Sequence, residues 1–153
     1  MDHPDWPTGL PTNFGGLDEE FSTLERSRAV VLPVPYDLST TYQGGARWGP
    51  AAILSASRNM ELWDDELGAT YRAGIHTLPE VEPTALGPEA MAARVERAVG
   101  WILERGRLPA VLGGEHSITA GAVRAAARRF GDLSVLHFDA HADIRDRYLD
   151  SPY

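Results

Sequence analysis

Two short polar motifs, each placed directly after an apolar run, constrain the fold of this chain most strongly. Residues 133–138 are mostly apolar and lead into Asp-Ala-His-Ala-Asp at 139–143, while residues 109–112 lead into Gly-Gly-Glu-His-Ser at 113–117. Apolar runs of this length, bounded by turn residues, are typical of buried parallel strands. The charged residues that follow cannot belong to the core, so we expect them to form a site.

The spacing within the second motif indicates a metal site. In an extended segment residues i, i+2 and i+4 share one face, so Asp139, His141 and Asp143 can converge on one point. Two carboxylates and one imidazole suit a divalent cation of the manganese type. The chain has no cysteine, which excludes zinc sites built on thiolates. By alternation, His137 is expected to face away from the neighbours of Asp139 and to be a core histidine, with a role in orienting a ligand as the alternative.

The segment between the motifs predicts a strand, helix, strand unit. Residues 120–130 form an alanine-rich stretch with apolar positions at helical spacing, and Gly131 fits a helix stop. The predicted stripe consists of Ile118, Ala122, Val123, Ala126 and Phe130. Parallel strands joined by such a crossover leave both motifs at the same edge of the sheet, which brings His116 within reach of Asp139.

At these residues the chain resembles the ureohydrolase family, the group of arginases and agmatinases. Residues 113–117 are similar to the family's first signature, residues 138–143 to its second, and residues 35–57 to its early stretch before the first long helix. The resemblance implies a three-layer α/β/α fold with a mostly parallel sheet. The family's third signature, an Asp-x-Asp run, does not occur after the second. We therefore expect residues 1–28 to be an amino-terminal arm and residues 29–153 to be the amino-terminal half of a single ureohydrolase domain.

The resemblance also implies a set of site residues. The metal ligands would be His116, Asp139, His141 and Asp143, holding two Mn²⁺ ions together with carboxylates that this chain lacks. Asp139 would bridge the two ions, and Asp139, His141 and Asp143 would act in catalysis by a metal-bridging hydroxide. Glu115 is either a supporting residue or a simple loop residue.

The substrate implied by the resemblance is a guanidino compound. Arginases usually carry an asparagine where this chain has Arg145, and residues 143–153 are more similar to the agmatinase branch. This favours a manganese-dependent agmatinase that converts agmatine to putrescine and urea, with the fragment alone expected to be inactive. The alternatives are an arginase or guanidinobutyrase-type enzyme, a single-zinc deacetylase of related fold, or an inactive truncated chain that binds metal or a partner.

Composition narrows the setting of this protein but does not identify it. The net charge of −8 and a pI near 5.0 disfavour nucleic-acid binding. No apolar run approaches the length of a membrane span, and the proline-broken start does not resemble a secretory signal. A cytoplasmic location is therefore expected, and the family resemblance implies a homo-oligomer, a trimer or hexamer.

Upstream of the motifs, the pattern predicts four further elements. Residues 29–34 are predicted to form a strand. Pro33 near its end and Pro35 just after it suit a strand end or an edge strand better than a central strand. A helix is expected over 51–60 after Pro50, and a short strand over 74–78. A second helix is expected from Pro88 to Gly106. Its predicted buried stripe consists of Met91, Val95, Val99 and Ile102.

Overall fold

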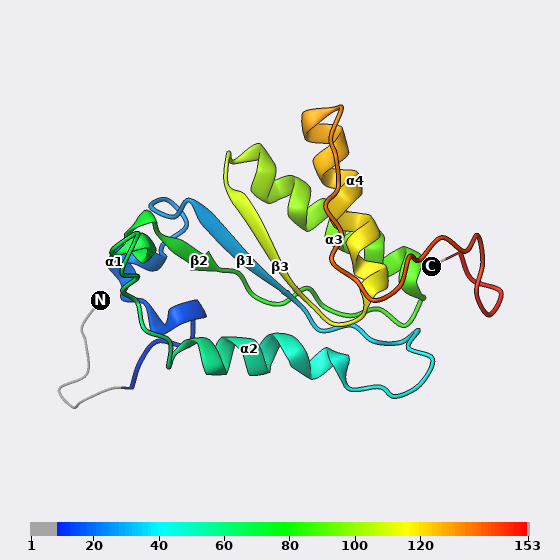
Figure 1. Ribbon diagram of the computed structural model, residues 1–153, viewed down its shortest axis with the longest axis horizontal. Coiled ribbons are helices and arrows are strands. Elements are labelled where there is room, and N and C mark those ends of the chain that lie inside the picture. The colour runs from blue at the N-terminus through cyan, green and yellow to red at the C-terminus, as the bar shows by residue number, and fades with distance from the viewer. Residues whose placement is uncertain (1–8, 153) are drawn as a thin grey trace.

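The protein, as a computed structural model that describes residues 9–152, is built around a parallel sheet (Figure 1). The sheet has three strands in the order β2-β1-β3, and both pairings are parallel. These strands are β1 (Ala29–Val34), β2 (Ile75–Thr77) and β3 (Leu108–Gly113). Each was predicted within about a residue of its observed bounds.

Helices cover both faces of this sheet, as the three-layer prediction requires. Helix α2 lies on one face, whereas α3 and α4 lie on the other (Figure 1). The bounds of these helices are α2 (Gly49–Ser57), α3 (Pro88–Glu104) and α4 (Thr119–Phe130). The shorter helical segments are η1 (Phe14–Gly16), α1 (Glu19–Ser22), η2 (Ala46–Trp48), η3 (Thr70–Ala73) and η4 (His116–Ile118). The fold is α/β, with Pro50 and Pro88 in the first turns of α2 and α3.

Strand β1 is the central strand of the sheet, contrary to the edge position that its prolines favoured. The carbonyl oxygens of Val31 and Pro33 accept hydrogen bonds from Leu78 and Val81, so these two residues face the β2 side. Strand β2 ends at Thr77, before it reaches the level of Pro33. The missing N–H of Pro33 therefore leaves no ladder partner unsatisfied, which is why a central strand tolerates it.

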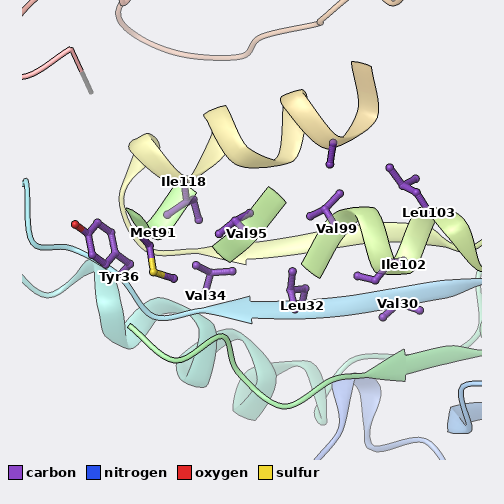
Figure 2. Close-up of a cluster of buried hydrophobic side chains, with 11 residues drawn as sticks. Val30, Leu32, Val34, Tyr36, Met91, Val95, Val99, Ile102, Leu103 and Ile118 are labelled. Atoms are coloured by element: carbon purple, nitrogen blue, oxygen red, sulfur yellow. The ribbon is translucent and has the colours of Figure 1, made fainter. Parts of the chain in front are cut away.

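The main core lies between β1 and α3. Val30, Leu32 and Val34 alternate along β1 and point towards α3 (Figure 2), and each is at most 2% exposed. The predicted stripe of α3 is confirmed, because Met91, Val95, Val99 and Ile102 are all buried against them. Burying side chains of this size stabilises a fold by about 1.5–3 kcal/mol each. Strand alternation and helical periodicity in the sequence therefore identified this layer correctly.

Helix α4 packs closely on α3, but its apolar stripe is only partly buried. A Cβ on Gly121 would lie 2.2 Å from the carbonyl oxygen of Ala92, so the contact depends on glycine. Ala125 is buried, and Ala122 and Ala126 pack at the border of the core. Phe130, which the stripe included, is 62% exposed instead. It lies in the last turn of α4, beyond the part that packs on α3.

Residues 133–138 do not form the predicted strand. They are irregular, and within residues 9–152 their backbone makes no hydrogen bond to a strand. Leu136 and Phe138 are 81% and 88% exposed. A buried strand needs a paired neighbour and cover on both faces, and the part of the chain that the structure describes supplies neither here. The segment instead runs back towards the amino-terminal end of α4 (Figure 1).

The described part of the predicted arm packs against the sheet layer. The Gly15 N–H donates to Ser57 Oγ at the end of α2, over 2.9 Å. The Phe14 N–H donates to Thr77 Oγ1 at the end of β2, also over 2.9 Å. Leu17 is only 2% exposed. These contacts attach residues 13–17 to both elements, while residues 1–8 of the predicted arm lie outside the described residues.

Candidate metal centre

The candidate site lies where the chain leaves β1 and β3. Val34 and Gly113 are register partners at the carboxyl ends of these two adjacent parallel strands. The chain reaches β2 from β1 through α2, and reaches β3 through α3 on the opposite face. Such a change of direction opens a crevice beyond the strand ends, where α/β proteins bind ligands. We call the segments that border it the β1 loop (residues 35–45) and the β3 loop (residues 114–118).

Four side chains gather at this edge with the donor set of a divalent cation. One ligand atom from each of His116, His137, Asp139 and Asp143 lies within 4.8 Å of the others. His116 Nδ1 is 2.7 Å from Asp143 Oδ2 and 3.5 Å from Asp139 Oδ2. Oxygen ligands of one small divalent cation at about 2.1 Å lie no more than about 4.2 Å apart. Small side-chain movements would therefore fit these residues to a metal ion.

Two histidines flank Asp139. His137 was expected to be a core histidine, yet its side chain is 41% exposed and its Nε2 lies 3.3 Å from Asp139 Oδ2. His141 stands on the other side of Asp139, with Nδ1 3.5 Å from Oδ1, and its side chain is 82% exposed. Residues 137 and 139 are two apart and so share a face in an extended segment, a signal that the prediction overlooked. Further along, Asp143 has φ 47°, in the left-handed region, so regular alternation does not extend to it. The assignment of His116, Asp139, His141 and Asp143 as ligands stays a prediction.

Asp139 is the central carboxylate of this cluster. Its Oδ1 accepts a hydrogen bond from the His141 backbone N–H over 2.8 Å. This hydrogen bond lowers the pKa of Asp139 below its ordinary value, and His137 and His116 lower it further. Oδ2 faces His116 and His137, whereas Oδ1 faces His141. The carboxylate thus offers one oxygen to each side of the cluster.

An open pocket of about 960 Å³ adjoins the cluster. His116, His141 and Asp143 line it from one side, and Arg145 and Tyr148 belong to its wall. The Arg145 guanidinium carbon lies 4.9 Å from the centre of the Tyr148 ring, a cation–π contact. The pocket is large enough for a small molecule that reaches the carboxylates.

Glu115 connects the β3 loop to the β1 loop. Its carboxylate accepts hydrogen bonds from the Ser39 N–H (2.8 Å), the Ser39 hydroxyl and the Ser117 hydroxyl. Glu115 is only 8% exposed, and its charge adds to the effect of burial in raising the pKa of Tyr36. Sequence reasoning left the role of Glu115 open. The structure shows that it is a buried, paired residue rather than a solvated one.

A second buried carboxylate organises the start of α2. Asp37 Oδ2 accepts the Gly45 N–H over 2.6 Å and the Arg47 N–H over 3.2 Å, and Oδ1 pairs with the Arg47 guanidinium. The Arg47 side-chain hydrogen bond is the main cause that lowers the pKa of Asp37 to about 2, and the Gly45 N–H contributes as well. Sequence reasoning did not single out this pair as functional. The signal that could have identified Asp37 is its position shortly after β1, at the strand ends where α/β proteins bind ligands.

The glycines of the first motif let the two loops touch. A Cβ on Gly114 would lie 1.9 Å from the Tyr36 carbonyl oxygen, and one on Gly113 would lie 2.6 Å from Ile118. These two glycines therefore allow the β3 loop to pack on the β1 loop and on its own helix.

Comparison with known proteins agrees with this geometry. The model of the arginase family matches residues 27–153, which include both loops and the whole cluster. The chain belongs to the arginase family. Within residues 9–152, no helix is long and apolar enough to cross a membrane.

This arginase-family chain is similar in sequence or structure to the following three proteins. It is 42% identical over 141 residues to an N(1)-aminopropylagmatine ureohydrolase of Thermus thermophilus, covering 92% of this chain and 47% of that protein. The agmatine ureohydrolase of Thermoplasma volcanium superposes with a TM-score of 0.78 at 32% identity, covering 87% of this chain and 44% of that one. The Trypanosoma cruzi formiminoglutamase with Mn²⁺ superposes with a TM-score of 0.72 at 27% identity, covering 82% and 44%. This arginase-family chain spans about half the length of the relatives it matches.

Proposed function

We propose that this protein is a manganese-dependent ureohydrolase that converts agmatine to putrescine and urea. The observation that carries the proposal is the convergence of His116, Asp139 and Asp143 beside the pocket, from the loops that also carry the family's two signatures. The resemblance to agmatine ureohydrolase supports the choice of a guanidino substrate.

The donor set suits two cations that share Asp139. His116, Asp139, His141 and Asp143 would hold the ions, because the Asp139 carboxylate faces His116 with Oδ2 and His141 with Oδ1, and His116 also contacts Asp143. Imidazole and carboxylate ligands are acceptable to manganese. Divalent cations bound here would lower the pKa of water from about 15.7 towards 7 and so supply a nucleophile at neutral pH. A guanidinium needs one, because its delocalised charge makes its carbon a poor electrophile.

The residues of this chain would also orient the reaction. As a ligand through one oxygen, Asp143 keeps its other oxygen free to accept a hydrogen bond from the attacking group. The pocket opens from this carboxylate, so a cationic guanidinium would enter towards negative charge. Arg145 stands where arginases carry the asparagine that helps bind a substrate carboxylate, and it lies over Tyr148 in the pocket wall. This supports agmatine over arginine as the substrate.

A longer polyamine derivative is the second candidate substrate. The relative that is 42% identical acts, by its name, on N(1)-aminopropylagmatine. That compound carries an additional aminopropyl group, and the open pocket of about 960 Å³ has room for it. The reaction would be the same, with spermidine in place of putrescine as the amine product.

The decisive experiment is a urea-release assay on the full-length gene product loaded with Mn²⁺. We expect urea from agmatine or N(1)-aminopropylagmatine at a kcat/KM well above that for arginine or guanidinobutyrate. Faster hydrolysis of guanidinobutyrate would move the assignment to a guanidino acid recognised through Arg145. Absence of urea from all four compounds in the manganese-loaded protein would reject the proposed function.

A further inference from the structure

The carboxylate of Glu115 is the main connection between the β1 and β3 loops. It accepts hydrogen bonds from both the N–H and the hydroxyl of Ser39 in the β1 loop. It also accepts one from the hydroxyl of Ser117, two positions further along its own loop. Both oxygens are used, and at 8% exposure water can replace little of this bonding.

The backbone around Glu115 is attached to the same segment. The Glu115 N–H donates to the Tyr36 carbonyl over 2.8 Å, and the Gly114 N–H donates to the Val34 carbonyl over 3.3 Å. Gly114 makes this approach possible, because any Cβ there would collide with Tyr36. Main chain and side chain therefore fix residue 115 relative to the end of β1.

His116 depends on this arrangement for its position. It follows Glu115 directly, and the next residue, Ser117, is bonded to the same carboxylate. The His116 side chain itself is 44% exposed, so core packing does not hold it. We propose that Glu115 is a positioning residue: by tying Ser39 and Ser117 together, its carboxylate holds the His116 backbone where the imidazole can meet Asp139 and Asp143. This inference rests on the proposed function, since it assigns His116 to a metal.

Such a role differs from a general contribution to stability. Residues that orient metal ligands typically change metal affinity by about 10–100-fold when they are replaced. A purely structural hydrogen bond would lower the thermal midpoint and leave the affinity of the folded protein unchanged. Ser57 provides a matched control, because its hydroxyl accepts from Gly15 and donates to Leu54 at the end of α2, away from the cluster.

The test is Mn²⁺ titration calorimetry on the full-length gene product, with the thermal midpoint of each metal-free variant measured in parallel. Ser39→Ala removes one tie and keeps the charge of Glu115, and we expect several-fold weaker Mn²⁺ binding. Glu115→Gln should weaken binding about 10–100-fold, because an amide nitrogen cannot accept the bonds that the carboxylate accepts. Glu115→Asp keeps the charge but shortens the side chain, and it should also weaken binding. Ser57→Ala should lower the thermal midpoint and leave the Mn²⁺ affinity unchanged.

Two results would overturn the proposal. In the first, Ser39→Ala and Glu115→Asp keep the wild-type Mn²⁺ affinity and only Glu115→Gln loses it. This would show that the charge of Glu115 acts on the cation directly rather than through the loops. Equal losses in Ser57→Ala and Ser39→Ala would show a general stability effect. Wild-type protein that binds Mn²⁺ but releases no urea would reject the proposed activity, while the affinities would still decide the role of Glu115.

Discussion

His116 Nδ1 lies 2.7 Å from Asp143 Oδ2, although one residue follows β3 and the other lies beyond the whole of α4. The contact exists because α4 packs back on α3 and the chain after Gly131 returns along it (Figure 1). Helix α4 and the returning segment therefore bring the two polar motifs together at the carboxyl edge of the sheet. This relationship underlies the predictions about metal binding.

Replacement of the cluster residues should abolish metal retention. We expect His116→Ala and Asp139→Asn in the full-length gene product to lose bound manganese, because each change removes or weakens one donor of the cluster. His76→Ala is the control, since its Nδ1 contacts the Ser22 carbonyl at 2.7 Å and not the cluster. Manganese content after desalting, measured by mass spectrometry, checks the prediction. Wild-type content in both cluster variants would contradict the ligand assignment.

The Asp37–Arg47 pair should make stability depend on pH in the acid range. The folded pKa of Asp37 is about 2, below the ordinary value of 3.8, so folding favours its charged form. The stability from this group is present above pH 3.8 and is lost as the pH falls through about 2. We expect Asp37→Asn to have a lower thermal midpoint than wild type near neutral pH, with the difference shrinking towards pH 2. A difference independent of pH would contradict this origin.

Two helical glycines should respond oppositely to alanine. Gly121→Ala in α4 would place a Cβ 2.2 Å from the Ala92 carbonyl oxygen, so the helices must separate. We expect a loss of more than about 2 kcal/mol in the free energy of unfolding, as for other overpacked contacts. Gly100→Ala in α3 has open space at the Cβ and should gain about 0.5–1 kcal/mol from helix propensity. Urea denaturation of both variants measures the two effects, and a stable Gly121→Ala protein would refute the close contact.

The core of α3 and the end of α4 should differ in their sensitivity to truncation. Ile102 is fully buried, and Ile102→Ala should lower the free energy of unfolding by about 2–5 kcal/mol through loss of contacts and a cavity. Phe130 is 62% exposed, so Phe130→Ala should change the free energy of unfolding by no more than about 0.5 kcal/mol. Chemical denaturation of both variants tests the observed burial. A large loss in Phe130→Ala would favour the predicted stripe over the observed packing.

Local patterns in the sequence correctly predicted the helices and strands that depend mainly on interactions between residues close in the chain. The prolines at α2 and α3, the glycine after α4 and the apolar spacing of Val95, Val99 and Ile102 all reflect interactions within a few residues. The run at residues 133–138 misled the same reasoning, because a strand depends on partners that lie elsewhere in the chain. Pro33 also led to a wrong prediction, an edge position for β1. Strand β2 stops before the level of Pro33, so the missing N–H of this proline disrupts no pairing in a central strand.

The candidate site shows the same division. Residue types and spacing singled out His116, Asp139 and Asp143, and the structure places these three side chains near one another although the predicted second strand does not form. His137 was wrongly expected to lie in the core, although positions 137 and 139 share a face in an extended segment and its Nε2 approaches Asp139. The pairing of Glu115 with Ser39 was beyond prediction, because it joins loops that are distant in the sequence.

By itself, the sequence determined most of the helices and strands, the donor types of the predicted site and the family to which the chain belongs, because periodicity and motif spacing are local properties. Only the tertiary structure decided that residues 133–138 stay outside the sheet, how deeply the stripe of α4 is buried and how the β1 and β3 loops are joined. Those outcomes depend on contacts between distant segments, where close packing and the pairing of buried polar groups select one arrangement from many that the local pattern permits.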